Sequence, residues 1–169
     1  MAKLYDEDIE DAMIDVLEQP KVVALGEIGL DYSSNNHCDH KLQQLVFRRQ
    51  LQLEMPADWP IHRHCFTGGW TEAQQWMDTF PNLFLGLTPL VGFHSAAPLA
   101  EVGRRIPLDR LLLETDAPYF LPNSESNRLK QSHPGMAIHV ATQLSAMRGI
   151  PLEEVLVAVR QNTRRMYRI

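Results

Sequence analysis

The chain has 169 residues, of which 44% are hydrophobic and 22% charged, and its formal net charge is −5 at pH 7. This composition is typical of a folded globular domain and excludes a disordered tail, a collagen and a coiled coil. The acidic charge argues against binding nucleic acid by bulk electrostatics alone. No apolar run reaches the roughly 18 to 20 residues of a membrane span. The two cysteines and an acidic N-terminus without an apolar h-region predict an intracellular protein, nuclear or cytoplasmic.

Helix-like and strand-like hydrophobic patterns alternate along the chain. In chain order we expect helix 9–17, strand 21–26, helix 40–53, strand 61–66, helix 73–80, strand 82–88, helix 99–106, strand 109–116, loop 118–134 and helices over 134–148 and from Pro151. The run KVVALG at 21–26 is continuously apolar and rich in β-branched residues, as in a strand buried on both faces. Thr71 is the expected N-cap of its helix. The alternation predicts a parallel α/β fold, and residues 1–169 are expected to form a single domain because no linker divides them.

The two ends of the chain carry opposite charge. Residues 1–18 hold seven acidic side chains against one lysine, whereas residues 155–169 hold four arginines and no acid. Two solvated helix faces, one acidic and one basic, explain this pattern. A phosphate-facing role for the basic end is the alternative.

Polar side chains stand where three of the predicted strands end. Glu27 follows the first strand, His64 lies in the second, and Asp116 ends the fourth. Because the C-terminal ends of parallel strands meet at one rim, we expect these side chains to converge there. Strand alternation puts His62 on the same face as His64, and Glu114 on the same face as Asp116.

Imidazole and carboxylate groups together suit Zn²⁺, Mn²⁺ or Mg²⁺ at a hydrolytic site. A bound metal lowers the pKa of water to about 7 and neutralises charge on a phosphoryl oxygen. The sequence has no Gly-rich phosphate loop and no G-x-S-x-G motif, and Cys65 and His64 are expected on opposite faces of their strand. Taken singly, Glu27, His64 or Asp116 is more often a helix cap, a salt-bridge partner or a core group. Their joint position at strand ends favours a metal site.

Several segments give a specific family resemblance. GEIGLDY at 26–32, HCFTG at 64–68 and LLETDAPYF at 112–120 resemble signature segments of the TatD-type metal-dependent deoxyribonucleases, which are amidohydrolase-like TIM barrels. NTRRMYRI at 162–169 is similar to the family's closing pattern. IHRHCFTG at 61–68 looks nearest to the eukaryotic TatD DNase domain-containing protein 2 branch. The resemblance covers nearly the whole chain.

The resemblance implies divalent-metal-dependent hydrolysis of phosphodiester bonds in DNA, usually as an exonuclease, with RNA as a further candidate substrate. It implies that Glu27 bridges two metal ions and that His64 is a metal ligand. It also implies that Asp116 binds metal and orients and deprotonates the attacking water, so that Asp116 and Glu27 are the catalytic residues. The implied cofactors are two divalent ions, of Mg, Mn or Zn.

Two parts of the family pattern are absent from this sequence. The family opens with a strand that carries His-x-His-x-x-Asp, and this sequence begins downstream of it. A Pro-Val-Ile-Leu-His strand is also missing, because the helix ending at Leu53 runs straight into residues 54–60. The expected fold is therefore an incomplete TIM-type barrel, truncated and internally deleted, since a full barrel takes about 250 residues. His62 faces the same way as His64, but it lies further down the strand and is a weak substitute ligand.

These losses leave two functions open. The first is a nuclease that works far more slowly than a complete family member. The alternative is a non-catalytic isoform or fragment that binds a partner or has no function. The losses also suggest that residues 21–26 pair with residues 61–66 and leave a bare apolar edge, through which the chain is expected to self-associate.

Overall fold

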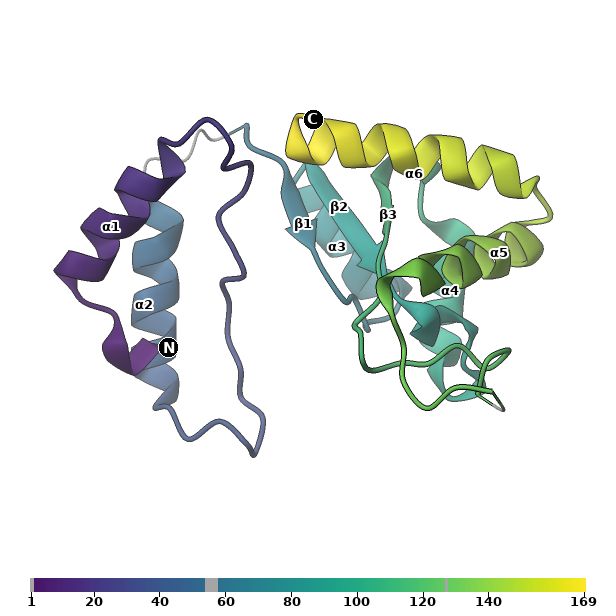
Figure 1. The fold of residues 1–169 in the computed structure, drawn as a ribbon, viewed down its shortest axis with the longest axis horizontal. Helices are drawn as coiled ribbons and strands as arrows, with labels where there is room; N and C mark the ends of the chain where they lie inside the picture. Colours follow the sequence, from purple (N-terminus) through teal and green to yellow (C-terminus); the bar gives the residue numbers. More distant parts are fainter. Residues whose placement is uncertain (1, 54–57, 127) are drawn as a thin grey trace. The chain divides into compact units, whose positions relative to one another are not determined.

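The computed structural model describes residues 2–53, 58–126 and 128–169 (Figure 1). The contacts of the chain gather in two compact units, Met1–Trp59 and Pro60–Ile169. The single domain expected over residues 1–169 stays a prediction. Among the described residues, no helix is both long and apolar enough to cross a membrane.

The N-terminal unit consists of two helices and the segments that connect them. A short 3-10 turn, η1 (Ala2–Leu4), precedes α1 (Glu7–Leu17) and α2 (His40–Gln52), which confirm the two predicted helices. Asp6 and Asp39 cap these helices, and each side chain accepts a hydrogen bond of 2.9 Å from a backbone N–H of the first turn. These caps satisfy amides that would otherwise lack a partner.

The predicted strand at residues 21–26 is wrong, because the described backbone there forms no strand. A strand exists only where neighbouring strands pair with its N–H and C=O groups. The family resemblance implies that this segment lies between two strands that the sequence does not contain. Because residues 21–26 form no strand, the predicted pairing with residues 61–66 and the predicted bare strand edge at 21–26 are also wrong. Self-association itself stays a prediction.

A parallel sheet of three strands forms the centre of the C-terminal unit. Its order is β1 (Ile61–Arg63), β2 (Leu83–Leu87) and β3 (Leu111–Leu113), so three of the four predicted strands are confirmed. The register places His62 beside Phe84, and both strand pairs are parallel. β1 and β3 are therefore the edge strands of this sheet.

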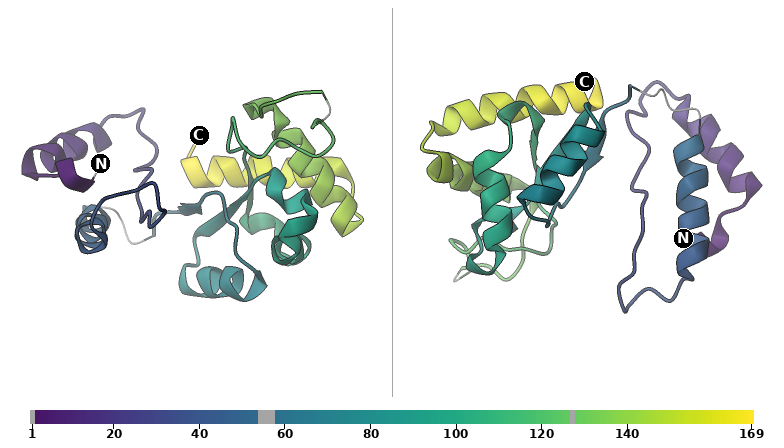
Figure 2. Two further views of the ribbon diagram at one scale, coloured as in Figure 1. Left: turned by 90° about the horizontal axis from the view of Figure 1, so that it is seen from below. Right: turned by 180° about the vertical axis from the view of Figure 1, so that it is seen from behind.

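Helices pack around this sheet, as Figure 2 shows. They are α3 (Trp70–Thr79), α4 (Ala97–Arg105), α5 (Ala137–Arg148) and α6 (Leu152–Tyr167), with 3-10 turns η2 (Pro89–Gly92), η3 (His94–Ala96), η4 (Leu108–Arg110) and η5 (Pro134–Met136). Alternate strand side chains, among them Leu83, Leu85, Leu87 and Leu111, are fully buried in the core that these helices share. A second cluster joins Phe84 and Leu112 to Met166 at the end of α6.

Two element boundaries differ from the sequence prediction. α3 begins at Trp70, so Gly69 and not Thr71 occupies the N-cap, and no side chain caps the helix. Trp70 is therefore the first residue of α3, and its side chain packs against the core. β3 begins only after η4, because the buried Asn162 side chain donates hydrogen bonds to the carbonyls of Leu108 (2.6 Å) and Leu111 (2.8 Å). These bonds hold the turn that the sequence pattern assigned to a strand.

The link between α1 and α2 is expected to weaken in acid. Arg49 donates to both carboxylate oxygens of Glu10, at 2.8 and 3.0 Å, and the Tyr5 hydroxyl donates to Glu10 at 2.7 Å. The hydrogen bond from Arg49, and then that from Tyr5, hold the pKa of Glu10 below its ordinary value of 4.5. A lowered pKa means that this contribution to stability is present above pH 4.5 and is lost as the pH falls through the folded-state pKa.

An NMR titration of the Glu10 carboxyl checks this prediction in the whole chain. The wild-type pKa is expected below the ordinary value, and Arg49→Met is expected to raise it. Arg48→Met, on an exposed neighbour, is the control and is expected to change nothing. An unchanged Glu10 pKa in Arg49→Met would contradict the assignment.

Candidate active site

The C-terminal ends of β1 and β3 carry the candidate side chains of the C-terminal unit. His64 follows β1 directly, and Glu114 follows β3 directly. Hydrogen bonds continue the pairing past the strand ends, from the Phe66 N–H to the Gly86 carbonyl (3.0 Å) and from the Glu114 N–H to the Leu87 carbonyl (3.1 Å). The segments that hold His64 and Glu114 are therefore both fixed to the end of β2.

Cys65 joins these two segments. Its backbone N–H donates a hydrogen bond to Oε1 of Glu114, and its thiol Sγ lies 3.8 Å from Oδ2 of Asp116. The Cys65 backbone has a φ of 44°, in the left-handed region that non-glycine residues seldom adopt. The hydrogen bond from the Cys65 N–H to the Glu114 carboxylate holds this turn in place. The structure thus brings the neighbour of His64 into contact with both carboxylates that follow β3.

Burial is the main reason that the pKa of the Cys65 thiol rises to about 11, and the charges of Asp116 and Glu114 add to the effect. The thiol therefore stays protonated at neutral pH, and a thiolate is the form that acts as a nucleophile. This protonation disfavours thiol chemistry at the site. It leaves the imidazole and carboxylate groups as the reactive side chains.

His62 lies on the same face as His64, as strand alternation predicts, and their ring centroids are 6.4 Å apart. Its Nδ1 is 2.7 Å from the Tyr167 hydroxyl, and its Nε2 is 3.5 Å from Oε2 of Glu114. Burial, and then the charge of His64, lower the pKa of His62 to about 4, so the ring is neutral at pH 7. Among the described residues, Nε2 is buried without a hydrogen-bond partner. The contact with Tyr167 ties His62 to α6.

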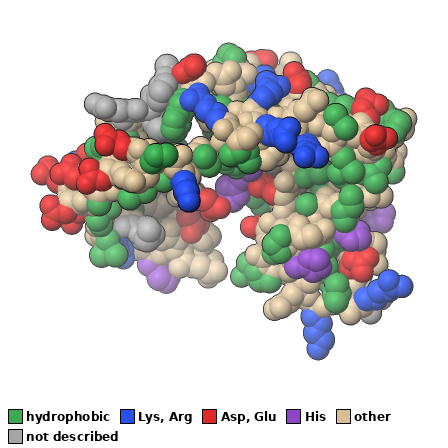
Figure 3. Space-filling view, turned by 45° about the horizontal axis from the view of Figure 1, so that its top comes forward, with side chains coloured by type: hydrophobic (Ala, Val, Ile, Leu, Met, Phe, Trp, Pro, Cys, Tyr) green, Lys and Arg blue, Asp and Glu red, His purple; other side chains and the backbone are tan. Residues whose placement is uncertain are grey.

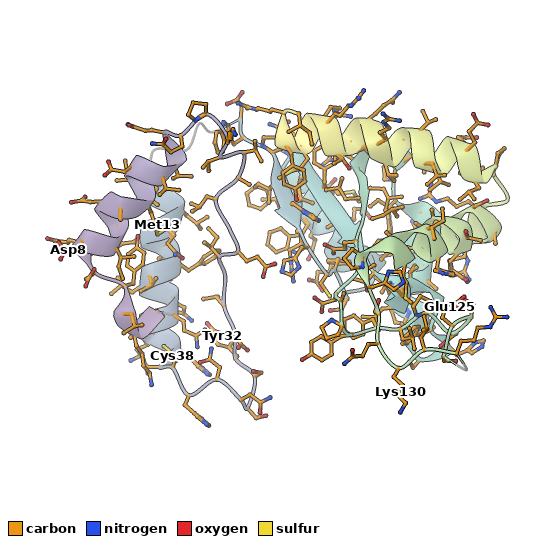
Figure 4. The ribbon with its side chains drawn as sticks, viewed as in Figure 1. Asp8, Met13, Tyr32, Cys38, Glu125 and Lys130 are labelled. Atoms are coloured by element: carbon orange, nitrogen blue, oxygen red, sulfur yellow. The ribbon has the colours of Figure 1, made fainter. Side chains whose placement is uncertain are left out.

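Glu27 lies in the N-terminal unit, where its residue is exposed. The segment that follows it is fixed by the buried side chain of Gln43, which accepts from the Asp31 N–H (2.8 Å) and donates to the Asp31 carbonyl (2.9 Å). Tyr32 then stacks on the His40 ring with centroids 4.1 Å apart, at the start of α2 (Figure 4). The convergence of Glu27 with His64 and Asp116 stays a prediction, because Glu27 belongs to a different unit.

Sequence reasoning missed three parts of this arrangement. Gln43 carried a usable signal, since it is a polar residue on the apolar side of its predicted helix. The sequence predicted that Glu114 lies on the same face as Asp116, but it did not predict the hydrogen bond from the Cys65 N–H to Glu114. Tyr167 had no local signal, because its partner His62 is 105 residues away along the chain.

Gly86 leaves the space that His62 and Glu114 occupy. A Cβ at this position would lie 2.4 Å from both the His62 Nε2 and the Glu114 Oε1, which is far inside van der Waals contact. We expect Gly86→Ala to displace both side chains and to break the bond from Cys65 to Glu114. Overpacking of this kind costs about 1–3 kcal/mol of unfolding free energy.

Urea denaturation monitored by circular dichroism measures this cost. Gly69→Ala is the matched control, since its Cβ would make only an ordinary contact of 3.5 Å. Equal midpoints for Gly86→Ala and the wild type would show that the site tolerates a side chain there.

The chemistry of His64 and Asp116 fits a divalent metal, because a neutral imidazole and a carboxylate are common ligands of Zn²⁺ and Mn²⁺. The C-terminal unit contributes two of the three predicted ligands, His64 and Asp116. Across the described parts of the chain, no group of three or more His, Cys, Asp or Glu side chains is arranged to hold a metal ion. The donors therefore match a metal site in kind, and they form only part of a ligand shell.

Comparison with known proteins identifies the family. The protein-family model described as "TatD related DNase" matches residues 1–61 and 54–168, which together span almost the whole chain. The human "3'-5' RNA nuclease TATDN2" is 38% identical over 192 residues, and the match covers 98% of this chain and 25% of that protein. The "Uncharacterized metal-dependent hydrolase YabD" of Bacillus subtilis is 33% identical, with 88% and 66% covered. The "3'-5' ssDNA/RNA exonuclease TatD" of Pantoea vagans is 30% identical, with 99% and 74% covered.

The same comparison supports the internal deletion. The 192 aligned positions of the human relative exceed the 169 residues of this chain, so at least 23 of them have no counterpart here. The two segments of the family match overlap at residues 54–61, which is where the family resemblance implies that a His-bearing strand is missing. Residues 54–57 lie outside the described structure. The chain thus spans a quarter of the length of the human relative and 66% of the Bacillus one.

Solved structures show the same fold. The TatD homologue YJJV of Escherichia coli has a TM-score of 0.84 at 25% identity, with 100% of this chain and 73% of that chain covered. A TatD-family hydrolase of Entamoeba histolytica has a TM-score of 0.76 at 24% identity, with 98% and 70% covered. The three-stranded parallel sheet with its helices is an incomplete barrel of this kind. The chain therefore belongs to the family of TatD-related DNases.

Proposed function

We propose that the chain hydrolyses phosphodiester bonds in nucleic acid with the help of a divalent metal ion. The observation that supports this proposal is the link at the sheet end, where Cys65 contacts Glu114 and Asp116 and so joins the His64 segment to the segment of Asp116. The names of the human and Pantoea relatives, an RNA nuclease and an ssDNA/RNA exonuclease, support both RNA and DNA as substrates. An intracellular location, nuclear or cytoplasmic, is part of the same proposal.

Each site residue has a separate role in this proposal. Glu27, His64 and Asp116 hold the metal, which is Mg²⁺, Mn²⁺ or Zn²⁺, with two ions in a complete family site. When bound, the metal supplies an activated water and neutralises charge on the phosphate. Asp116 orients the attacking water and accepts its proton. Glu114 is a positioning residue, because its bond to the Cys65 N–H fixes the turn next to His64.

The rate is expected to be low. The C-terminal unit supplies two of the ligands, and no larger metal-binding group occurs among the described residues. This finding also favours the second candidate, a family member that binds nucleic acid or another partner without cleaving it. The two candidates differ in whether any metal supports turnover.

An assay on end-labelled single-stranded DNA and RNA tests the proposal. The purified chain is incubated with Mg²⁺, Mn²⁺ or Zn²⁺ separately, and with EDTA. We expect slow release of short products with at least one metal and none with EDTA. Cleavage that persists in EDTA would contradict the proposal, and intact substrate with every metal would establish the non-catalytic candidate.

A further inference from the structure

The C-terminal half of α6 carries a row of exposed arginines. Arg160 and Arg164 are one helical turn apart, and Arg168 follows after the same interval at the end of the helix. We call these three residues the arginine row. Figure 3 shows Lys and Arg side chains gathered over this part of α6. No acidic residue occurs from residue 155 to the last residue, although the chain as a whole has a net charge of −5.

Helix stability does not account for the arginine row. Cations near a helix C-terminus interact favourably with the helix dipole, but that effect falls off within the last turn, and Arg160 lies outside it. Like charges four residues apart destabilise a helix. Within the described parts of the chain, Arg160 and Arg164 also form no ion pair. The charges of Arg160 and Arg164 therefore face solvent at some cost to the helix.

The buried side chains on the other face of α6 hold the helix in one orientation, with the arginine row toward solvent. Val155, Val159, Asn162 and Met166 are buried, and the Asn162 side chain donates to two backbone carbonyls around the start of β3. Arg165, beside the row, lies with its guanidinium 5.3 Å from the centre of the Phe84 ring. Inward-facing residues of this end of α6 contact the sheet, Asn162 at Leu111 and Tyr167 at His62. The row therefore lies on the exposed side of a helix that the core holds in place.

We propose that the arginine row binds the phosphate backbone of the nucleic acid at a second contact, outside the candidate active site. Arginine guanidinium groups bind phosphate through paired hydrogen bonds, and their spacing of about 6 Å along the helix allows successive phosphates to be contacted. This inference rests on the proposed function, because it names a further contact with the same class of substrate. The bound strand would extend past the cleavage site to α6.

Salt-dependent binding tests the proposal without any hydrolysis. A fluorescent single-stranded 20-nucleotide DNA is titrated with the whole chain in EDTA, at several salt concentrations, and binding is read by anisotropy. Each phosphate contact to a single strand contributes a slope of about −0.7 to the plot of log K against log salt. Arg160→Gln/Arg164→Gln is therefore expected to make the slope shallower by about 1.4.

Two further variants make the outcome decisive. Arg104→Gln/Arg128→Gln removes the same charge from exposed positions elsewhere in the unit and is expected to keep the wild-type slope. Arg160→Lys/Arg164→Lys keeps the charge and is expected to restore most of the slope. Equal slopes for the two Gln variants, or no salt dependence in the wild type, would overturn the proposal. Hydrolysis of a short substrate tests the active site separately, so failure of the row leaves the proposed function standing.

Discussion

Replacing Asp116 with Asn is expected to reduce metal-dependent hydrolysis by about 100-fold or more. Loss of groups that merely orient metal ligands typically costs about 10–100-fold, and in our proposal Asp116 is itself a ligand and the base for the attacking water. The amide keeps the shape of the side chain but carries neither the charge nor the basicity. Initial rates on labelled single-stranded DNA, at the metal that gives the highest wild-type rate, measure the effect.

Asp78→Asn is the matched control for this substitution. Asp78 is exposed on α3, away from the strand ends, and the same change there is expected to leave the rate unaltered. If Asp116→Asn and Asp78→Asn kept the same rate, the role given to Asp116 would be wrong.

Replacing Phe66 with Ala is expected to lower the free energy of unfolding of the C-terminal unit by about 3–5 kcal/mol. The Phe66 side chain is fully buried in the core, and its backbone N–H pairs with Gly86 directly beyond His64. The ring leaves a cavity, and the expected loss is large compared with the total stability of a domain, which is about 5–15 kcal/mol. Urea denaturation at 25 °C, monitored by circular dichroism, measures the loss.

Thr67→Ala on the exposed next residue is the control and is expected to change stability little. A Phe66→Ala midpoint close to that of the wild type would mean that Phe66 is not part of a cooperative core. Because Phe66 also anchors the strand end, the destabilised variant is expected to hydrolyse nucleic acid more slowly as well.

Local patterns predicted most of the helices and the three strands of the sheet. The stripe that ends at Leu17 and the buried run over residues 82–88 are determined by neighbours in sequence, and both were confirmed. The run at residues 21–26 has an equally strong strand pattern, but the described backbone there pairs with no other strand. Propensity alone therefore gave the wrong answer there, because strand formation depends on partners that a local window does not contain.

The candidate site was only partly predictable for the same reason. His64 and Asp116 were found because the ends of parallel strands meet at one edge, which is a rule of topology. The contacts that position these segments are long-range and follow no local pattern. The Glu114 bond to Cys65 spans 49 residues, and the Tyr167 contact with His62 spans 105. Gly86 had no signal in the sequence, since its role is to leave room for side chains from two other strands.

Binding of Mn²⁺ to the whole chain tests the central claim most directly, namely that His64 and Asp116 hold a divalent metal. Free Mn²⁺ is followed by electron paramagnetic resonance as protein is added. The account predicts weak uptake by the wild type and by Asp78→Asn, and loss of that uptake in His64→Gln and in Asp116→Asn. Equal uptake by all four proteins, or none by the wild type, would contradict it.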